Sequence, residues 1–281
     1  MEKAKSLLRL TRPINSLMVG LAVLVGTLAT GGLKAIGKPG ELLLAALTGF
    51  SLSAAAMAVN DYCDREIDAV NEPQRPIPSG KVTPQEALAL TAITSTIGLG
   101  ASAAINPQAL GVALIAWILL ISYSTWGKKR GLLGNLMVSG GVALPFVYGG
   151  VLSGRMTASL SFALVAFLVN TGREITKGIV DVEGDAKHGV NTLAVNLGPH
   201  QAAKAAAALY LTGVASSILP WSIGAVSYLY LPFTLLTDLG LILLSMRLVQ
   251  DPSRDTSRTV KNQVLILMAL GLLGFALGSL S

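Results

Sequence analysis

Residues 42–80 read LLLAALTGFSLSAAAMAVNDYCDREIDAVNEPQRPIPSG, and this stretch decides the fold. It contains no charged residue as far as Val59, and an apolar run of about 20 residues is long enough to cross a bilayer as a helix. Asp61, Asp64 and Asp68 follow at once. At about 100° per residue these three lie within about 60° of arc on a helix. The stretch therefore predicts a membrane-spanning helix that ends in a row of carboxylates.

The composition extends this prediction to the whole chain. Hydrophobic residues make up 52% of it and charged residues 13%, with a mean hydropathy of +0.63, whereas soluble domains carry about 25% charged residues. This excludes the water-soluble, disordered and fibrous classes. We predict an all-α polytopic membrane protein, a single domain over residues 1–281. Its nine transmembrane helices are expected at residues 14–33, 42–59, 87–105, 109–125, 132–152, 159–170, 202–219, 223–246 and 264–280, the sixth continuing toward Asp181.

The distribution of basic residues predicts the orientation. With a cytoplasmic N-terminus, the 21 Lys and Arg residues all fall on the cytoplasmic side except Lys34, Lys38 and Arg155. The positive-inside rule predicts this bias for a multi-pass protein of the cell membrane. Because anionic lipid beside the inner segments accounts for the pI of about 9.5, we expect membrane lipids as partners, with no nucleic acid and no obligate protein partner.

A second acidic segment, REITKGIVDVEGD at residues 173–185, lies at another cytoplasmic helix end. Arg173, Lys177, Asp181 and Asp185 follow one another at steps of four residues, which places them along one helical stripe. Taken alone, the stripe is equally typical of a ligand-binding site and of a solvated helix end with weak ion pairs. Two carboxylate rows on the same side of the membrane favour a metal-diphosphate site, because oxygen ligands select a hard ion such as Mg²⁺.

Further cations lie in the segments between and after these rows. Arg75 is in a proline-rich loop, residues 72–80, that cannot be helical, so we expect it near the first row, where it could bind a phosphate through two nitrogens. Lys128, Lys129 and Arg130 end the fourth span. Such a run is most often a topology anchor, although one lysine could face a phosphate. Residues 184–198, which are rich in glycine, are predicted to form a lid.

The motifs at residues 60–80 and 181–185 resemble the two aspartate-rich signatures of the UbiA superfamily of intramembrane prenyltransferases. The resemblance implies a nine-helix bundle with a cytoplasmic cap that binds a prenyl diphosphate on Mg²⁺. Matched position by position, it implies Asn60, Asp64, Asp181 and Asp185 as metal ligands. It further implies catalytic or supporting roles for Asp61, Asp68 and Tyr123, with Asp68 or the diphosphate as proton acceptor, and diphosphate binding by Arg75, Lys128 and Lys177. Lys128 follows Tyr123 by five positions, a looser spacing than the family's tyrosine-lysine motif.

Within the superfamily, residues 12–26 and 173–185 are most similar to archaeal enzymes of ether-lipid synthesis. These transfer a geranylgeranyl group to the second hydroxyl of geranylgeranylglyceryl phosphate, a lipid-like acceptor. Arg12 is then a candidate partner for the acceptor's phosphate, although it could equally snorkel to lipid head groups. Asn15 is a candidate for lining the acceptor pocket. Aromatic, quinone and chlorophyllide acceptors remain alternatives.

An ion-coupled secondary transporter is the alternative from another class of protein. Transporters bind coupling ions near the midplane of the membrane, whereas these carboxylates lie at the rim, which favours an enzyme. Asp238, inside the eighth span, is the exception. Either it is a proton or ion site, or it is hydrogen-bonded to a neighbouring helix, which we favour.

Overall fold

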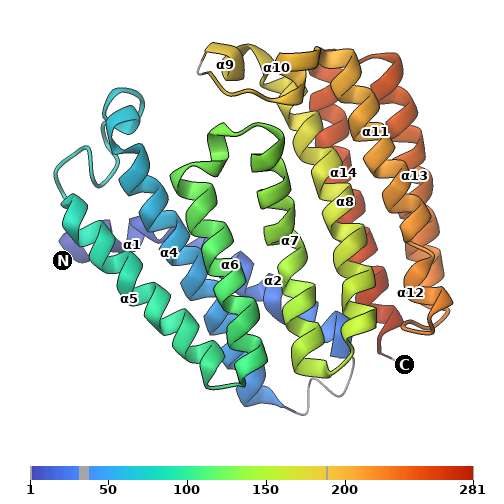
Figure 1. Ribbon diagram of the computed structural model, residues 1–281, viewed down its shortest axis with the longest axis horizontal. Coiled ribbons are helices and arrows are strands. Elements are labelled where there is room, and N and C mark those ends of the chain that lie inside the picture. Colours follow the sequence, from blue (N-terminus) through green and yellow to red (C-terminus); the bar gives the residue numbers. More distant parts are fainter. Residues whose placement is uncertain (1, 32–37, 188, 281) are drawn as a thin grey trace. The chain divides into compact units, whose positions relative to one another are not determined.

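The computed structural model describes residues 2–31, 38–187 and 189–280, so Leu33, at the predicted end of the first span, and Lys34 lie outside the described residues. Within these ranges all regular secondary structure is helical (Figure 1). The helices are α1 (Glu2–Leu10), α2 (Pro13–Gly31), α4 (Pro39–Asn71), α5 (Pro84–Ala103), α6 (Pro107–Thr125), the short 3₁₀ helix η1 (Gly127–Lys129), α7 (Leu132–Ser153), α8 (Met156–Val180), α9 (Val182–Lys187), α10 (Leu193–Leu197), α11 (Pro199–Ser216), α12 (Leu219–Ser222), α13 (Tyr230–Gln250) and α14 (Arg254–Gly278).

Each of the nine predicted spans corresponds to a long helix in the described part of the chain. Seven segments are long and apolar enough to cross a membrane: α2, α4, α6, α7, the pair α11 and α12, α13 and α14. The helices α5 and α8, for the third and sixth predicted spans, are 20 and 25 residues long but are not among the seven. The protein is thus all-helical with at least seven segments suited to a membrane, and nine spans stay a prediction.

Two predicted boundaries are settled by local structure. The sixth span does continue past Arg173, because α8 reaches Val180. The eighth predicted span begins too early, since α13 starts at Tyr230. Residues before it form a turn in which the Ala225 amide donates to the Pro220 carbonyl at 2.8 Å. Gly224 occupies a left-handed conformation, φ 66°, which interrupts the helix there.

Contacts divide the described chain into two compact units. Unit 1 comprises residues 2–25 and 38–126, and therefore α1, most of α2, α4, α5 and α6. Close packing of α4 on α5 depends on a small residue of α5, because the Leu52 side chain of α4 lies against Gly98. Trp117 of α6 donates a hydrogen bond to Ser95 of α5 at 2.9 Å. The start of α5 is fixed by a capping box between Thr83 and Glu86.

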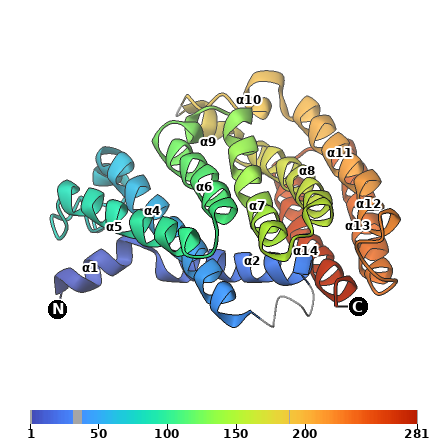
Figure 2. The same cartoon turned by 60° about the horizontal axis from the view of Figure 1, so that its bottom comes forward.

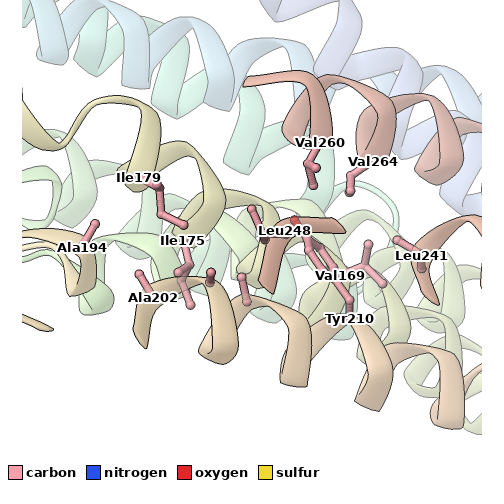
Figure 3. Packing of buried hydrophobic residues seen from close by; sticks show 12 residues of the cluster. Val169, Ile175, Ile179, Ala194, Ala202, Tyr210, Leu241, Leu248, Val260 and Val264 are labelled. Atoms are coloured by element: carbon pink, nitrogen blue, oxygen red, sulfur yellow. The ribbon is translucent and has the colours of Figure 1, made fainter. Parts of the chain in front are cut away.

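Unit 2 comprises residues 26–31 and the described residues from 127 onward. Its long helix α8 lies between α7 and α11 in both ribbon views (Figures 1 and 2). Its core joins α8, α11, α13 and α14, with Tyr210 fully buried beside Val169 (Figure 3). Ala194 of the short helix α10 belongs to the same core. The segment containing α9 and α10 is therefore anchored to the bundle.

Polar side chains within the spanning helices of unit 2 pair with neighbouring helices. Asp238 of α13 accepts a hydrogen bond from the hydroxyl of Ser217, at the end of α11, at 2.7 Å. Asn170 of α8 donates to Ser139 of α7 at 3.1 Å. The hydrogen bond that the structural interpretation of Asp238 requires is therefore present.

Candidate active site

The acidic end of α4 separates its carboxylates into two groups. The side chains of Asp61 and Asp68 are only 7% and 9% exposed. They share one azimuth because seven residues make nearly two turns. Asn60 and Asp64 lie on the neighbouring azimuth, and the Asn60 amide donates to the Asp64 carboxylate at 3.0 Å. The predicted acidic face thus carries the buried pair Asp61 and Asp68 beside the hydrogen-bonded pair Asn60 and Asp64.

Arg12 reaches the first of these rows from a distant part of the sequence. Its Nη2 lies 2.7 Å from Oδ1 of Asp61, 49 residues away in the chain. Arg12 is the second of the two residues between α1 and α2, and its φ of 42° makes it the one non-glycine residue with positive φ among those described. A buried Leu10 side chain holds the adjacent turn of α1. The strained backbone is therefore compensated by packing and by an ion pair.

The amino-terminal helix is itself tied to unit 1 by charge. Lys3 of α1 forms an ion pair with Glu86 at the start of α5. This hydrogen bond holds the pKa of the Glu86 carboxyl below its ordinary value. Because the pair is exposed, it contributes little stability, but it adds to the contacts that fix α1 and the Arg12 turn.

Arg75 reaches the same carboxylates from the proline-rich loop. Its Nη1 lies 2.7 Å from Oδ2 of Asp68 and 3.6 Å from Oδ1 of Asp61. The loop is non-helical, as predicted, and Ile77 and Val82 are buried beneath it. These residues pack with Leu10 in one small core, so the loop holds Arg75 in place.

Arg12, Asp61, Arg75 and Asp68 consequently form a ladder of alternating charge. Both arginines approach the same oxygen of Asp61, and their side chains remain 35% and 33% exposed. A guanidinium has five N–H donors, and the ion pairs of each arginine occupy one of its nitrogens. The ladder can therefore orient two guanidinium groups while leaving donors for an anion.

The remaining predicted residues of unit 1 lie elsewhere on its helices. Asn15 is exposed in the first turn of α2. Tyr123 is half-buried in the last turn of α6. The structure thus brings together Arg12, Arg75 and the carboxylates, but it records no contact of Asn15 with them.

In unit 2, the acidic segment begins on α8 with a buried carboxylate. Glu174 is 8% exposed and binds Nη1 of Arg173 at 3.0 Å and Nζ of Lys177 at 3.5 Å. Lys177 keeps 48% of its side chain exposed. Glu174 was not predicted as a site residue, although its position three residues before Lys177 is the helical spacing of an ion pair.

The predicted continuous stripe from Arg173 to Asp185 is wrong in one respect. The helix α8 ends at Val180, with Asp181 as its exposed C-cap residue, and α9 begins at Val182. The Asp185 amide still donates to the Asp181 carbonyl at 2.8 Å, so the two acids remain one turn apart. Helical periodicity alone could not show this break, since it assumes a single axis.

The two candidate lysines at residues 128 and 129, both in unit 2, differ in the exposure of their side chains. Both lie in η1, directly before α7, but Lys128 is half-buried and engaged in an interaction, whereas Lys129 is exposed. Of the two, Lys128 is thus the better candidate for binding a phosphate, and Lys129 fits the role of a topology anchor.

The chemistry of the ligand atoms fits a magnesium ion. Among the described residues, no three His, Cys, Asp or Glu side chains are grouped so that they could hold a metal. The predicted ligands Asn60, Asp64, Asp181 and Asp185 all offer oxygen. Mg²⁺ keeps several waters and needs only one or two carboxylates together with substrate phosphates. A closed carboxylate cage is therefore not required.

These features define a class of protein: a multi-helix membrane protein that presents carboxylates and partly exposed cations at helix ends. The chain belongs to the UbiA prenyltransferase family, whose profile matches residues 16–270. It is a prenyltransferase and a multi-pass membrane protein.

Several relatives extend the similarity over the whole chain. Digeranylgeranylglyceryl phosphate synthase of Methanopyrus kandleri is 36% identical over 96% of this chain and 98% of its own length. A solved structure reported for digeranylgeranylglyceryl phosphate synthase in membranes has a TM-score of 0.92 and 31% identity, covering 100% of this chain and 99% of that one. A UbiA homologue from Archaeoglobus fulgidus bound to DMAPP and Mg²⁺ has a TM-score of 0.75 and 21% identity, with coverage of 98% and 100%. This last likeness concerns the fold.

Proposed function

We propose that this prenyltransferase transfers a geranylgeranyl group from its diphosphate to the sn-2 hydroxyl of geranylgeranylglyceryl phosphate, with Mg²⁺ as cofactor. The observation that carries the proposal is the pair of partly exposed arginines, Arg12 and Arg75, that share one oxygen of Asp61. A donor diphosphate and an acceptor phosphate together need more cations than a neutral acceptor would. The relatives named above, which span nearly the whole chain, support the same acceptor.

In the proposed reaction, the C–O bond between the allylic carbon and the diphosphate breaks, and the acceptor oxygen forms the new C–O bond. Asn60 and Asp64, and likewise Asp181 and Asp185, would hold Mg²⁺, which would supply charge neutralisation for the leaving diphosphate. Arg75, Lys128 and Lys177 bind phosphate oxygens and stabilise the charge that develops on them. Tyr123, near the end of α6, is assigned to the same donor site.

The acceptor hydroxyl loses its proton as it attacks, and we assign this proton to the released diphosphate. Asp61 and Asp68 are buried and paired with arginines, so their role is to position Arg12 and Arg75. Arg12 binds the acceptor phosphate, and Asn15 lines the acceptor pocket. Apolar helices exclude the water that would otherwise quench an allylic cation.

We place the protein in the cell membrane with its N-terminus and the mouth of its active site in the cytoplasm. The excess of Lys and Arg in the predicted inner segments supports this orientation. In this proposal the whole chain acts as one domain with nine spans, counting α5 and α8, and α9 and α10 belong to the cap on the cytoplasmic side.

The test is an assay of purified protein with geranylgeranyl diphosphate and three acceptors: geranylgeranylglyceryl phosphate, 4-hydroxybenzoate and a chlorophyllide. We expect preferential product with the glycerophosphate, and preferential product with either other acceptor would overturn the acceptor assignment. The transporter alternative predicts no release of diphosphate. Protein that moves an ion without releasing diphosphate would therefore refute the assignment.

Arg12→Ala sharpens this test. We expect it to raise the acceptor KM by about tenfold and the donor KM much less, since an ion pair to phosphate is lost. Arg9→Ala is the matched control. Arg9 is exposed in the last turn of α1, so its substitution removes the same charge beside the lipid head groups. Equal effects of the two substitutions would show that Arg12 only contacts lipid.

A further inference from the structure

The backbone around residue 191 makes an unusually close approach to the segment that carries Lys128. A Cβ atom placed on Gly131 would lie 1.8 Å from the carbonyl oxygen of Asn191, so the two backbones are in direct contact. Gly131 also adopts φ 52°, a conformation that favours glycine. Only a glycine fits at this point of the chain.

The Asn191 carbonyl is fixed from its other side. Asn196 of α10 donates to it through Nδ2 at 3.3 Å. The next residue, Thr192, caps α10 by accepting from the Val195 amide at 3.3 Å. Because α10 contributes Ala194 to the core of unit 2, residues 190–192 form a seat that is anchored to the bundle. We call residues 190–192 the cap seat.

The cap seat contacts three segments that each carry a residue of the proposed donor site. Gly131 follows Lys128 by three residues, and η1 packs on the start of α7, where a Cβ on Gly134 would lie 2.7 Å from the Gly127 carbonyl. On α8, Gly178 faces the side chain of Thr192 and is the neighbour of Lys177. The Val190 amide donates to the Asp185 carbonyl at 2.9 Å.

We infer that Gly131 is a positioning residue for donor binding: it seats residues 190–192 against the η1 segment and thereby sets the place of Lys128. This inference rests on the proposed function. The physical reason is geometric, since displacing a binding group by about 1 Å can cost a large factor in activity. A side chain at residue 131 forces the two backbones apart and moves the turn that carries Lys128.

The first experiment compares Gly131→Ala with Gly154→Ala in the assay with geranylgeranyl diphosphate. Gly154 ends α7 as Gly131 begins it, has φ 70°, and has no atom within 4 Å of its would-be Cβ. Both substitutions place a side chain at positive φ, although Gly154 (ψ 10°) has the milder left-handed helical conformation and Gly131 (ψ −117°) does not. Only Gly131→Ala also meets a backbone. We expect the donor KM to rise about tenfold or more for Gly131→Ala alone, with the acceptor KM unchanged. Equal donor KM values for the two variants would overturn the inference.

The second experiment separates positioning from a general loss of structure. In the double variant Gly131→Ala with Lys128→Gln, we expect a donor KM no higher than that of Lys128→Gln, because the two changes remove one interaction. Multiplicative effects would overturn the inference and leave the role of Lys128 intact. If Lys128→Gln itself leaves the donor KM unchanged, the proposed donor site fails and the inference falls with it.

A milder variant covers the case in which Gly131→Ala does not fold. Asn196→Ala removes the hydrogen bond to the Asn191 carbonyl from an exposed position of α10. We expect a donor KM raised about two- to fivefold, the scale of one neutral hydrogen bond. That increase must disappear when Lys128 is already Gln, and an increase that persists contradicts the inference.

Discussion

The two acidic helix ends meet a similar chemical requirement by different means. At the end of α4 the helix continues unbroken to Asn71, and its buried carboxylates are paired with arginines from other segments, Arg12 and Arg75. At the end of α8 the helix stops at Val180, and the buried acid is paired with cations of its own helix. The first end is organised by long-range ion pairs and the second by local pairs and backbone hydrogen bonds.

This difference indicates where each end is vulnerable. The arginine ladder depends on packing among α1, α4 and the loop at residues 72–80, so loss of one member leaves a buried charge without its partner. The second end depends on a single helix and on the cap seat that follows Asp185. We therefore expect single substitutions to cause larger losses at the first end, except at the metal ligands, where both ends should be equally sensitive.

The largest effect should come from removing metal ligands. We expect chelation of Mg²⁺ to abolish prenyl transfer, and Asp64→Asn and Asp181→Asn each to lower kcat by about 100-fold or more, because charge on the leaving diphosphate is no longer neutralised. Steady-state assays across a Mg²⁺ titration measure this. Circular dichroism should show intact helices in both variants. Full activity in excess chelator would contradict the metal assignment, and a loss in only one variant would break the equivalence of the two ends.

Arg75 tests the long-range organisation of the first end. Arg75→Ala should raise the donor KM by about tenfold and lower thermal stability, because Asp68 loses its ion pair. Arg75→Lys keeps the charge but loses the planar guanidinium and should recover only part of the affinity. Arg65→Ala is the control, since Arg65 lies on α4 near Asp68 but pairs with the exposed Glu66. Unchanged donor KM and stability in Arg75→Ala would show that the loop only connects two helices and does not bind the donor.

Glu174 provides the matching test at the second end. Glu174→Gln removes the charge shared by Arg173 and Lys177 while keeping a side chain of the same size. We expect a donor KM raised about two- to fivefold, because ion pairs between neighbouring side chains of one helix are worth only about 0.2–0.5 kcal/mol each. Glu183→Gln, an exposed acid of α9, should have no effect in the same titration. A loss as large as that of Arg75→Ala would contradict the distinction between the ends.

The smallest effect is expected at Asp238, a carboxylate that belongs to neither end. Asp238→Asn keeps an oxygen that can accept the hydrogen bond from Ser217. Prenyl transfer should therefore stay within about twofold of the wild type, a difference below the worth of one hydrogen bond. Loss of transfer in this variant, with the fold retained, would show that Asp238 acts as a proton or ion site.

The sequence by itself determined the helical fold class and indicated most of the residues that we propose carry the chemistry. Apolar length indicated the helices, and the non-helical loop containing Arg75 followed from its three prolines. The metal ligands and donor lysines came from the resemblance of two short motifs to a known family. These properties are local, because helical periodicity and proline geometry depend on residues close together in the chain.

Only the tertiary structure decided which charges pair with which. The contact between Arg12 and Asp61 spans 49 residues, and no periodic pattern relates them. The break at Asp181, the burial of Glu174 and the seat of Asn191 on Gly131 likewise became visible only in the folded chain. The physical reason is that burial and ion pairing are set by which helices pack together, whereas the sequence pattern specifies each helix separately.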